Sequence, residues 1–235
     1  MTAIISDIHG NYPALKAVMD DIEERGIKKI ISLGDICGYY SMINECIELL
    51  KDMNVVNIVG NHDYYMIENE KCERSISVNK SLDFQRQVIT NDNFKWLKRS
   101  IPFYRDSMHY MVHGSFSENG MDNYLYTINN DMFATFKEKY FFAGHTHVQT
   151  LIGLDKNRLF CNPGSVGQPR DGDHRSAYAI INNDAIELIR LKYDIDMIAN
   201  HMKKNGFESY FYENLYTGSN LRKNIRSISF DKDNI

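Results

Sequence analysis

The first 60 residues alternate between short apolar runs and amphipathic segments, and this alternation restricts the fold more than any other feature of the sequence. Residues 2–6, 28–33 and 55–59 are apolar and rich in β-branched side chains, which is typical of strands. Between them, residues 11–26 and 42–53 carry apolar side chains at helical spacing. Strands joined through helices need right-handed crossovers, so we predict a largely parallel sheet. The composition of residues 55–59 predicts a strand buried on both faces.

The second half of the chain has a different character. Two helical segments, residues 78–89 and 93–100, precede it, and a helix is predicted within residues 194–206. Short strands are predicted within residues 109–114, 139–153, 157–162, 176–182 and 185–193. Asn183 and Asp184 would form the turn of a hairpin between the last two. We therefore expect an α/β half followed by a β-rich half, with two packed sheets and helices outside.

Length and cysteine usage indicate one domain in a reducing compartment. The 235 residues are enough for a substantial core, and we assign residues 1–217 to a single domain. Residues 218–235 are polar and irregular, which is typical of a mobile C-terminal tail. The four cysteines form no CxxC pair and no zinc-ribbon spacing. The chain shows no secretory signal pattern and no apolar run of transmembrane length, so we expect a cytoplasmic protein without membrane contact.

Residues that can bind metals follow the apolar strands at their carboxyl ends. They are Asp7 and His9, then Asp35, then Asn61 and His62, then His113, and finally His145 and His147. Ligand sites of open α/β sheets lie outside the carboxyl ends of strands. Members of the pairs Asp7/His9 and His145/His147 are two residues apart, so in extended chain they would point to the same side. Carboxylate and amide oxygens mixed with imidazole suit first-row divalent metals better than calcium.

Each of these residues taken alone has a simpler explanation. An Asp at a strand end is more often a turn residue or a helix cap, and a lone His is more often a surface or core residue. We give the simpler explanation to His109, as a strand side chain, and to His201, on a helix surface. The role of His174 stays open. For Asp63, a helix cap is preferred over a role in orienting His62. The combination on five strand ends is what indicates a metal centre.

Five segments of this chain resemble the motifs of the calcineurin-like metallophosphoesterases: "SDIHGN", "GDICGY", "VGNHD", "VHGS" and "GHTHV". The resemblance spans residues 3–195, and "NPGSVGQPRDGD" is similar to the compact bacterial and archaeal phosphodiesterase-like branch. It implies an α/β (α+β) fold, a four-layer αββα sandwich of two mixed β-sheets flanked by helices. It also implies two divalent metal ions, of Mn, Fe, Zn or Ni. Their ligands would be Asp7, His9, Asp35 and His147 for one ion, and Asp35, Asn61, His113 and His145 for the other.

The resemblance further implies hydrolysis of phosphodiesters or small phosphorylated metabolites. A hydroxide bridging the two metals, which share Asp35, would attack phosphorus in line with the leaving oxygen. His62 would not bind a metal. It would face the leaving group and protonate it as a general acid.

Four more residues are candidates to bind substrate. Arg170 and Arg175 suit a phosphate, although ion pairs with neighbouring aspartates explain them equally well. Tyr39 and Tyr40 could stack on a base or an aryl leaving group, and packing at the edge of the sandwich explains them at least as well.

Differences between this sequence and the motifs of related enzymes argue against some classes of substrate. The stretch "GDICGYY" lacks the GDxxDRG pattern of phosphoprotein phosphatases, and "GNHD" stands where they have GNHE, so a protein serine/threonine phosphatase is disfavoured. A net charge of −4 and the lack of a separate capping domain, which related DNA-repair nucleases have, disfavour long nucleic acid.

Two alternatives to a general phosphodiesterase stay open. One is a dinucleoside polyphosphate or other nucleotide hydrolase. The other is a non-enzymatic binding scaffold of the same fold, as in a retromer subunit, although the intact set of seven ligands argues against it. The expected partner is a small phosphoester substrate, and association into a homo-oligomer is left open.

Overall fold

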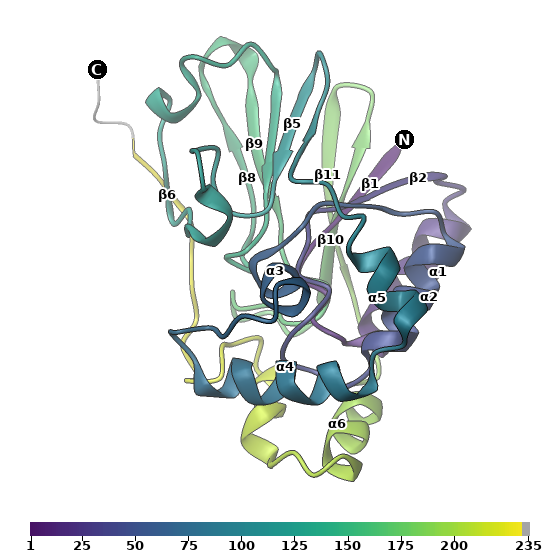
Figure 1. The fold of residues 1–235 in the computed structure, drawn as a ribbon. Helices are drawn as coiled ribbons and strands as arrows, with labels where there is room; N and C mark the ends of the chain where they lie inside the picture. The colour runs from purple at the N-terminus through teal and green to yellow at the C-terminus, as the bar shows by residue number, and fades with distance from the viewer. Residues whose placement is uncertain (232–235) are drawn as a thin grey trace.

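The computed structural model describes residues 1–231 and contains two five-stranded β-sheets packed face to face (Figure 1). The strands are β1 (Thr2–Ile5), β2 (Lys29–Ser32), β3 (Val56–Asn57), β4 (Tyr104–Arg105), β5 (His109–Val112), β6 (Thr127–Ile128), β7 (Tyr140–Ala143), β8 (Gln149–Gly153), β9 (Leu159–Pro163), β10 (Ser176–Asn182), β11 (Ala185–Leu191) and β12 (Ser229–Phe230). The α-helices are α1 (Tyr12–Glu24), α2 (Ile43–Asp52), α3 (Asn61–Ile67), α4 (Ile76–Val88), α5 (Asn91–Leu97) and α6 (Ile195–Lys204). Short 3₁₀ turns occupy Gly120–Asp122, Asp131–Phe133, Asp155–Asn157, Ser209–Phe211 and Glu213–Tyr216.

The first sheet joins strands from both ends of the chain, in the order β11-β10-β1-β2-β3. β1, β2 and β3 are parallel, as the alternation of strands and helices predicts. The β10–β11 hairpin, whose turn contains Asn183 with a φ of 52°, pairs antiparallel with β1. The second sheet has the order β4-β5-β7-β9-β8, with parallel central strands and antiparallel edges. Both sheets are therefore mixed, and the predicted fold class is confirmed.

Apolar side chains fill the space between the layers. Ile4 and Ile31 of the first sheet meet Met111 and Phe142 of the second in one buried cluster. α1 and α2 cover the outer face of the first sheet, where buried side chains such as Val18 each contribute about 1.5–3 kcal/mol. The outer face of the second sheet is covered by residues 115–138, in which 3₁₀ turns take the place of long helices. All six α-helices consequently lie beside or below the first sheet (Figure 1).

The third strand is shorter and more exposed than predicted. β3 contains only Val56–Asn57 and lies at the edge of its sheet, where the Val56 side chain is 39% exposed. Ile58 lies outside β3, although its amide donates to the Ser32 carbonyl at 2.9 Å, and it forms an isolated bridge with Ile101. The prediction of a strand buried on both faces is wrong, because Val56 is exposed whereas Asn57 is buried, and successive side chains of a strand point to opposite faces.

The C-terminal residues, assigned to a tail, lie against the domain as far as residue 231. The Gly172 amide donates to the Gly218 carbonyl at 2.9 Å, and the Arg226 amide donates to the Arg170 carbonyl at 2.7 Å. β12 then pairs in parallel with β6. The last four residues of the predicted tail, 232–235, lie outside the described residues.

Two further predictions concern membrane-spanning helices and the state of the cysteines. Within residues 1–231, none of the helices has the length and apolar character that crossing a bilayer requires. The four cysteines are free and buried.

Candidate metal centre

The seven predicted ligands lie together where the carboxyl ends of the parallel strands of both sheets meet. Asp7 and His9 follow β1, Asp35 follows β2, Asn61 begins α3, His113 follows β5, and His145 and His147 follow β7. Each of the seven is at most 3% exposed. The first sheet therefore supplies the carboxylates, the amide and one imidazole, and the second sheet supplies three imidazoles.

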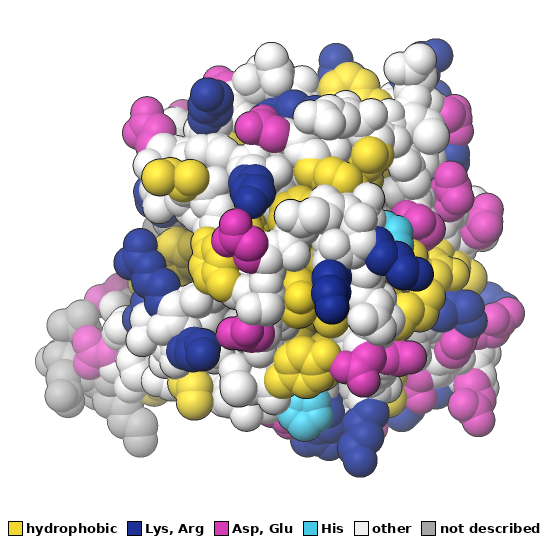
Figure 2. Space-filling model, turned by 90° about the horizontal axis from the view of Figure 1, so that it is seen from below, with side chains coloured by type: hydrophobic (Ala, Val, Ile, Leu, Met, Phe, Trp, Pro, Cys, Tyr) yellow, Lys and Arg dark blue, Asp and Glu magenta, His cyan; other side chains and the backbone are white. Residues whose placement is uncertain are grey.

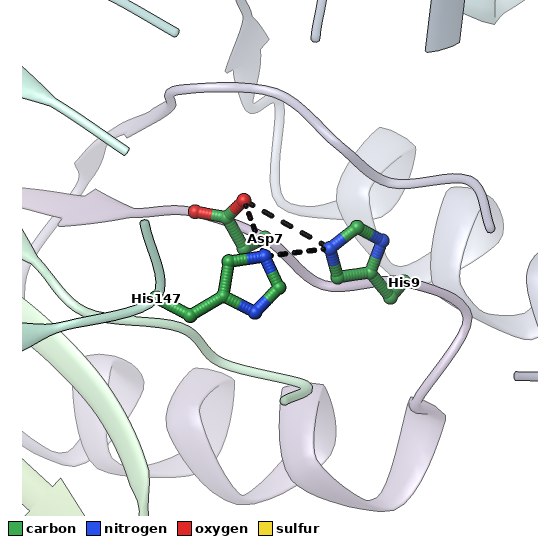
Figure 3. A group of neighbouring side chains, drawn as sticks. All are labelled: Asp7, His9 and His147. Atoms are coloured by element: carbon green, nitrogen blue, oxygen red, sulfur yellow. Dashed lines mark hydrogen bonds and ion pairs between the residues drawn. The ribbon is translucent and has the colours of Figure 1, made fainter. Parts of the chain in front are cut away.

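One group of ligand atoms comes from Asp7, His9 and His147 (Figure 3). The Nε2 atom of His147 lies 3.1 Å from Asp7 Oδ1 and 3.1 Å from His9 Nε2. His9 Nε2 is 3.8 Å from the same carboxylate oxygen. Figure 3 shows the two rings and the carboxylate turned toward one another, so their ligand atoms surround a common point.

A second group of ligand atoms comes from Asp35, His113 and His145. His113 Nε2 lies 3.4 Å from Asp35 Oδ2 and 3.1 Å from Asn61 Oδ1. Asp35 Oδ2 is also 3.7 Å from His9 Nε2, in the first group. Asp35 thus stands between the two groups, as a shared ligand must.

Backbone carbonyls orient three of the imidazoles. Nδ1 of His9 is 2.7 Å from the Cys37 carbonyl, and Nδ1 of His147 is 2.6 Å from the Gln168 carbonyl. Nδ1 of His113 is 2.9 Å from the Leu33 carbonyl. A carbonyl can only accept, so each Nδ1 carries the proton, and in the neutral ring Nε2 presents its lone pair to the centre.

Several buried polar atoms at the centre have no hydrogen-bond partner within the described residues: Asp7 Oδ1, Asp35 Oδ2 and His145 Nε2. The other oxygen of each carboxylate is satisfied. Asp7 Oδ2 accepts from the Ser6 hydroxyl at 2.6 Å and from the His145 amide at 3.0 Å, and Asp35 Oδ1 accepts from the His62 amide at 2.9 Å. A buried carboxylate oxygen without a partner is costly, and a cation supplies what it lacks. The residues present therefore fit divalent metal ions.

The protonation states of the buried carboxylates and imidazoles at the centre depend on one another. Burial by itself raises the pKa of Asp35, but the imidazoles of His113 and His62 outweigh burial and hold that pKa well below its usual range. Burial lowers the pKa of His9 and His145 well below the ordinary histidine value. At neutral pH these two imidazoles are therefore in the neutral form, which is the form that binds metals.

Five of the predicted ligands have a left-handed backbone. The φ angles are 55° at Asp7, 54° at His9, 58° at Asp35, 62° at His145 and 60° at His147. Non-glycine residues in this region cost roughly 1–3 kcal/mol each and cluster at functional sites. The expectation that the pairs share a side because the chain is extended is therefore wrong. These turns bend the backbone after β1 and β7, so that Asp7 and His9 contribute to one group of ligand atoms while His145 and His147 contribute to different groups.

His62 lies beside both groups. It is the second residue of α3, and its Nε2 is 3.9 Å from Asp35 Oδ2. Its ligand atom, with those of His9 and Asp35, forms a third group that could hold a cation. The buried Nδ1 has no hydrogen-bond partner within residues 1–231 and faces Gly38, where a Cβ atom would come within 2.1 Å of it. Gly38 has a φ of +86°, so both space and conformation favour glycine there.

Asp63 holds the backbone that carries Asp35. Its carboxylate accepts from the amides of Asp35 at 3.0 Å, Ile36 at 2.9 Å and Cys37 at 3.0 Å. It also accepts from the Gly60 amide at 3.2 Å, at the start of α3. Asp63 therefore acts partly as the predicted helix cap. Its hydrogen bonds go to backbone amides, not to the His62 ring.

A cavity of about 530 Å³ opens beside the centre and is lined by Tyr39, Asn61, His62 and Arg170, among others. The buried guanidinium of Arg170 donates to the Tyr39 hydroxyl at 3.0 Å and to Gln168 Oε1 at 2.6 Å. The Tyr39 ring contacts His9 and His62, with ring centroids 4.6 and 5.1 Å apart. Two of the four candidate substrate-binding residues thus lie at the cavity.

The other two candidates lie elsewhere. Tyr40 is 1% exposed, and its hydroxyl accepts from Gln168 at 3.0 Å and Asn214 at 3.3 Å, so it is a packing residue. Arg175 pairs with Asp173 at 2.6 Å and does not line the cavity. These positions agree with the simpler explanations, which are packing for Tyr40 and an ion pair for Arg175.

Further residues line the cavity without having been predicted: Arg74, Tyr124, Arg222 and Arg226. The Tyr124 ring stacks on His145, with centroids 3.9 Å apart and an angle of 23° between the planes. These residues lie outside the five motifs. The basic segment "SNLRKNIR" contains Arg222 and Arg226, whereas no sequence pattern singled out Arg74 or Tyr124.

Comparisons with known proteins agree with this geometry. The model of the calcineurin-like phosphoesterase superfamily domain matches residues 1–185. An uncharacterised protein of Methanocaldococcus jannaschii is 35% identical over 240 residues, which cover 93% of this chain and 98% of that protein. A solved metallophosphoesterase from Sphaerobacter thermophilus is 29% identical with a TM-score of 0.79, covering 92% of this chain and 98% of that one. A hypothetical protein from Pyrococcus horikoshii shares the fold with a TM-score of 0.82 at 20% identity, covering 93% and 99% of the two chains.

Proposed function

Because this chain belongs to the calcineurin-like phosphoesterase superfamily and is a hydrolase, we propose that it is a dinuclear-metal enzyme acting on phosphodiesters or small phosphorylated metabolites. The observation that carries the proposal is the pair of buried carboxylate oxygens, Asp7 Oδ1 and Asp35 Oδ2, that face imidazole nitrogens and have no hydrogen-bond partner within residues 1–231. The partner we propose is accordingly a small phosphoester.

The two groups of ligand atoms correspond to two ions. Asp7, His9 and His147 would hold one ion, and Asp35 would be shared between both. The other ligands of the second ion would be Asn61, His113 and His145. When bound, two such cations polarise a phosphate and activate a water molecule at neutral pH. Mn, Fe, Zn and Ni all suit this mixture of oxygen and imidazole ligands.

Arg170 and His62 would complete the site from the cavity side. The Arg170 guanidinium is fixed by Tyr39 and Gln168 and has no carboxylate partner within the described residues, so it is free to bind a phosphate oxygen. His62 would donate a proton to the leaving oxygen. Burial lowers the pKa of His62 to about 4, and the negative charge of a bound phosphate opposes this shift, which favours the imidazolium that a general acid requires.

Metal loading tests the proposal. Purified protein, stripped with a chelator and reloaded with Mn²⁺ or Zn²⁺, is expected to hold two ions per chain and to cleave bis(4-nitrophenyl) phosphate. His113→Asn removes a ligand of the second group and should reduce both metal content and rate. His109→Asn is the matched control, because this histidine is held by Asp106 at 2.9 Å, away from the centre. One ion per chain in the wild type contradicts the dinuclear proposal, and two ions without cleavage of any ester support the scaffold alternative.

A further inference from the structure

The cavity beside the metal centre is more basic than one phosphate requires. Arg74, Arg170, Arg222 and Arg226 line it, and none of its described lining residues is acidic. Arg74 is paired with Asp122. The other three arginines make no ion pair within residues 1–231.

Aromatic rings hold Arg74 and Arg226 at the cavity. The rings of Tyr124 and Tyr126 stack with centroids 5.4 Å apart and planes within 8°. The Arg74 guanidinium lies 5.6 Å from the centre of the Tyr124 ring, and that of Arg226 lies 5.7 Å from the centre of the Tyr126 ring. The backbone bond from the Arg226 amide to the Arg170 carbonyl brings the C-terminal segment to the same wall of the cavity.

The face of the molecule seen from below carries side chains of both charges. Figure 2 shows the molecule from below, where Lys and Arg side chains are interspersed with acidic and hydrophobic ones. The chain as a whole has a net charge of −4. A cavity of about 530 Å³ with unpaired guanidinium groups therefore suits a compact organic polyanion better than an extended one.

We propose that Arg222 and Arg226 bind a second phosphoryl group of the substrate, and that the preferred substrates are organic phosphates carrying at least two phosphoryl groups. This inference rests on the proposed function, which places the scissile phosphate at the metal centre beside Arg170. A guanidinium offers a planar pair of N–H donors that matches phosphate oxygens. Both arginines lie beyond residue 185, where the match to the family model ends.

A matched pair of nitrophenyl esters tests the inference. One is thymidine 5′-(4-nitrophenyl phosphate), and the other is the same ester with an added 3′-phosphate. In both, water adds to the 5′ phosphorus and the bond to the 4-nitrophenolate oxygen breaks. We expect kcat/KM of the metal-loaded enzyme to be at least about tenfold higher for the 3′-phosphorylated ester. This is the gain that one hydrogen bond to a charged group provides. In the double variant Arg222→Gln/Arg226→Gln the ratio should fall to about 1.

Lys223→Gln is the control, since Lys223 lies between the two arginines in sequence, pairs with Glu213 at 3.9 Å and does not line the cavity. It removes a positive charge from the same segment and should keep the wild-type ratio. Equal kcat/KM values for the two esters in the wild type overturn the inference. The inference is also overturned if the double variant keeps the wild-type ratio of kcat/KM values for the two esters. The same holds if Lys223→Gln lowers this ratio as much as the double variant does.

Calorimetric binding of thymidine 3′,5′-bisphosphate and thymidine 5′-phosphate separates this inference from the proposed function. If the metal-loaded protein cleaves neither ester but binds the bisphosphate about tenfold more tightly, and the double variant loses this preference, the second phosphate site stands and the proposed function fails. If both esters are cleaved equally and both nucleotides bind equally, the proposed function stands and the second phosphate site does not exist.

Discussion

His62 differs from the ligand residues around it in what it faces. Its ring packs against Tyr39 and Gly38, and it lines the cavity in which substrate would lie. The two groups of ligand atoms proposed for the metals are complete without it. We propose that this position beside the cavity serves proton transfer to the leaving oxygen.

Replacing His62 by Ala should leave both metal ions in place and reduce kcat. Loss of a positioned general acid typically costs about 10²–10⁴-fold, and the cost should be largest for alkyl esters, whose leaving oxygen needs a proton. For nitrophenyl esters, which leave without one, the cost should be small. Metal content and kcat for both ester types provide the measurement.

His174→Ala is the control for this experiment, since His174 is exposed and does not line the cavity. Loss of a metal ion in His62→Ala would instead make His62 a ligand, in agreement with the third group of ligand atoms. An equal loss for both ester types would make it a phosphate-binding residue.

The start of α3 and the loop after β2 form one unit. Asp63, in the first turn of α3, accepts four backbone hydrogen bonds, three of them from residues 35–37. The other side of the loop is held by Gln85 of α4, which accepts from the Gly38 amide at 2.7 Å and donates to the Tyr40 carbonyl at 2.6 Å. The position of Asp35 therefore depends on two helices as well as on its own strand.

Asp63→Asn should weaken this unit and, through it, the metal centre. The amide NH₂ of Asn would face backbone donors that the carboxylate now satisfies, and hydrogen bonds to a charged group contribute about 1.5–3 kcal/mol each. We expect the free energy of unfolding to fall by about 2–4 kcal/mol, as one or two of these bonds are lost. Metal affinity should fall about 10–100-fold, as for loss of a group that orients a ligand. Urea unfolding and metal titration measure the two effects.

Asp106→Asn is the matched control, because Asp106 also accepts from backbone amides, those of Met108 and His109, but at the start of β5 and away from the centre. It should reduce stability without changing metal affinity. Unchanged metal affinity in Asp63→Asn would show that the loop keeps Asp35 in place without this carboxylate.

The candidate metal centre forms only when both sheets are assembled. Each group of ligand atoms combines the first sheet with the second, since His147 joins Asp7 and His9, and His113 and His145 join Asp35. The buried interface between the sheets therefore sets the distances among the ligands. The C-terminal segment adds the last wall of the cavity through Arg222 and Arg226.

Deletion of residues 219–235 should separate metal binding from substrate preference. All seven predicted ligands precede residue 148, so two metal ions should remain bound. Ile228 and Phe230 pack against the outer face of the second sheet, and their loss should reduce the free energy of unfolding by about 2 kcal/mol. The preference for the 3′-phosphorylated ester should disappear.

Elemental analysis, urea unfolding and the ester pair test this variant. Loss of metal ions from a folded truncated protein would contradict the assignment of all ligands to residues 1–147. A preserved preference would place the second phosphate on Arg74 or Arg170 instead.

The sequence by itself determined the class of the fold and the set of residues that are candidates to bind metal. Strands and helices follow from the periodicity of apolar side chains, which is a local property. Asp7, His9, Asp35 and the later ligands could be found because ligand-type residues directly after apolar strands have few other reasons to occur together. The periodicity and the placement of ligand-type residues after strands can both be read from residues that are neighbours in the sequence.

The tertiary structure decided whatever depends on contacts between distant parts of the chain. Within the predicted strand 55–59 only Val56–Asn57 form β3, which is an edge strand because β2 flanks it on one side only. Arg175 is neutralised by Asp173, two residues away, whereas Arg170 reaches Tyr39, 131 residues away, and so lines the cavity. Arg226 contributes to that cavity only because the chain returns to it after α6. The local sequence does not distinguish these arginines from one another. Their roles differ because the fold brings a different partner within hydrogen-bond distance of each.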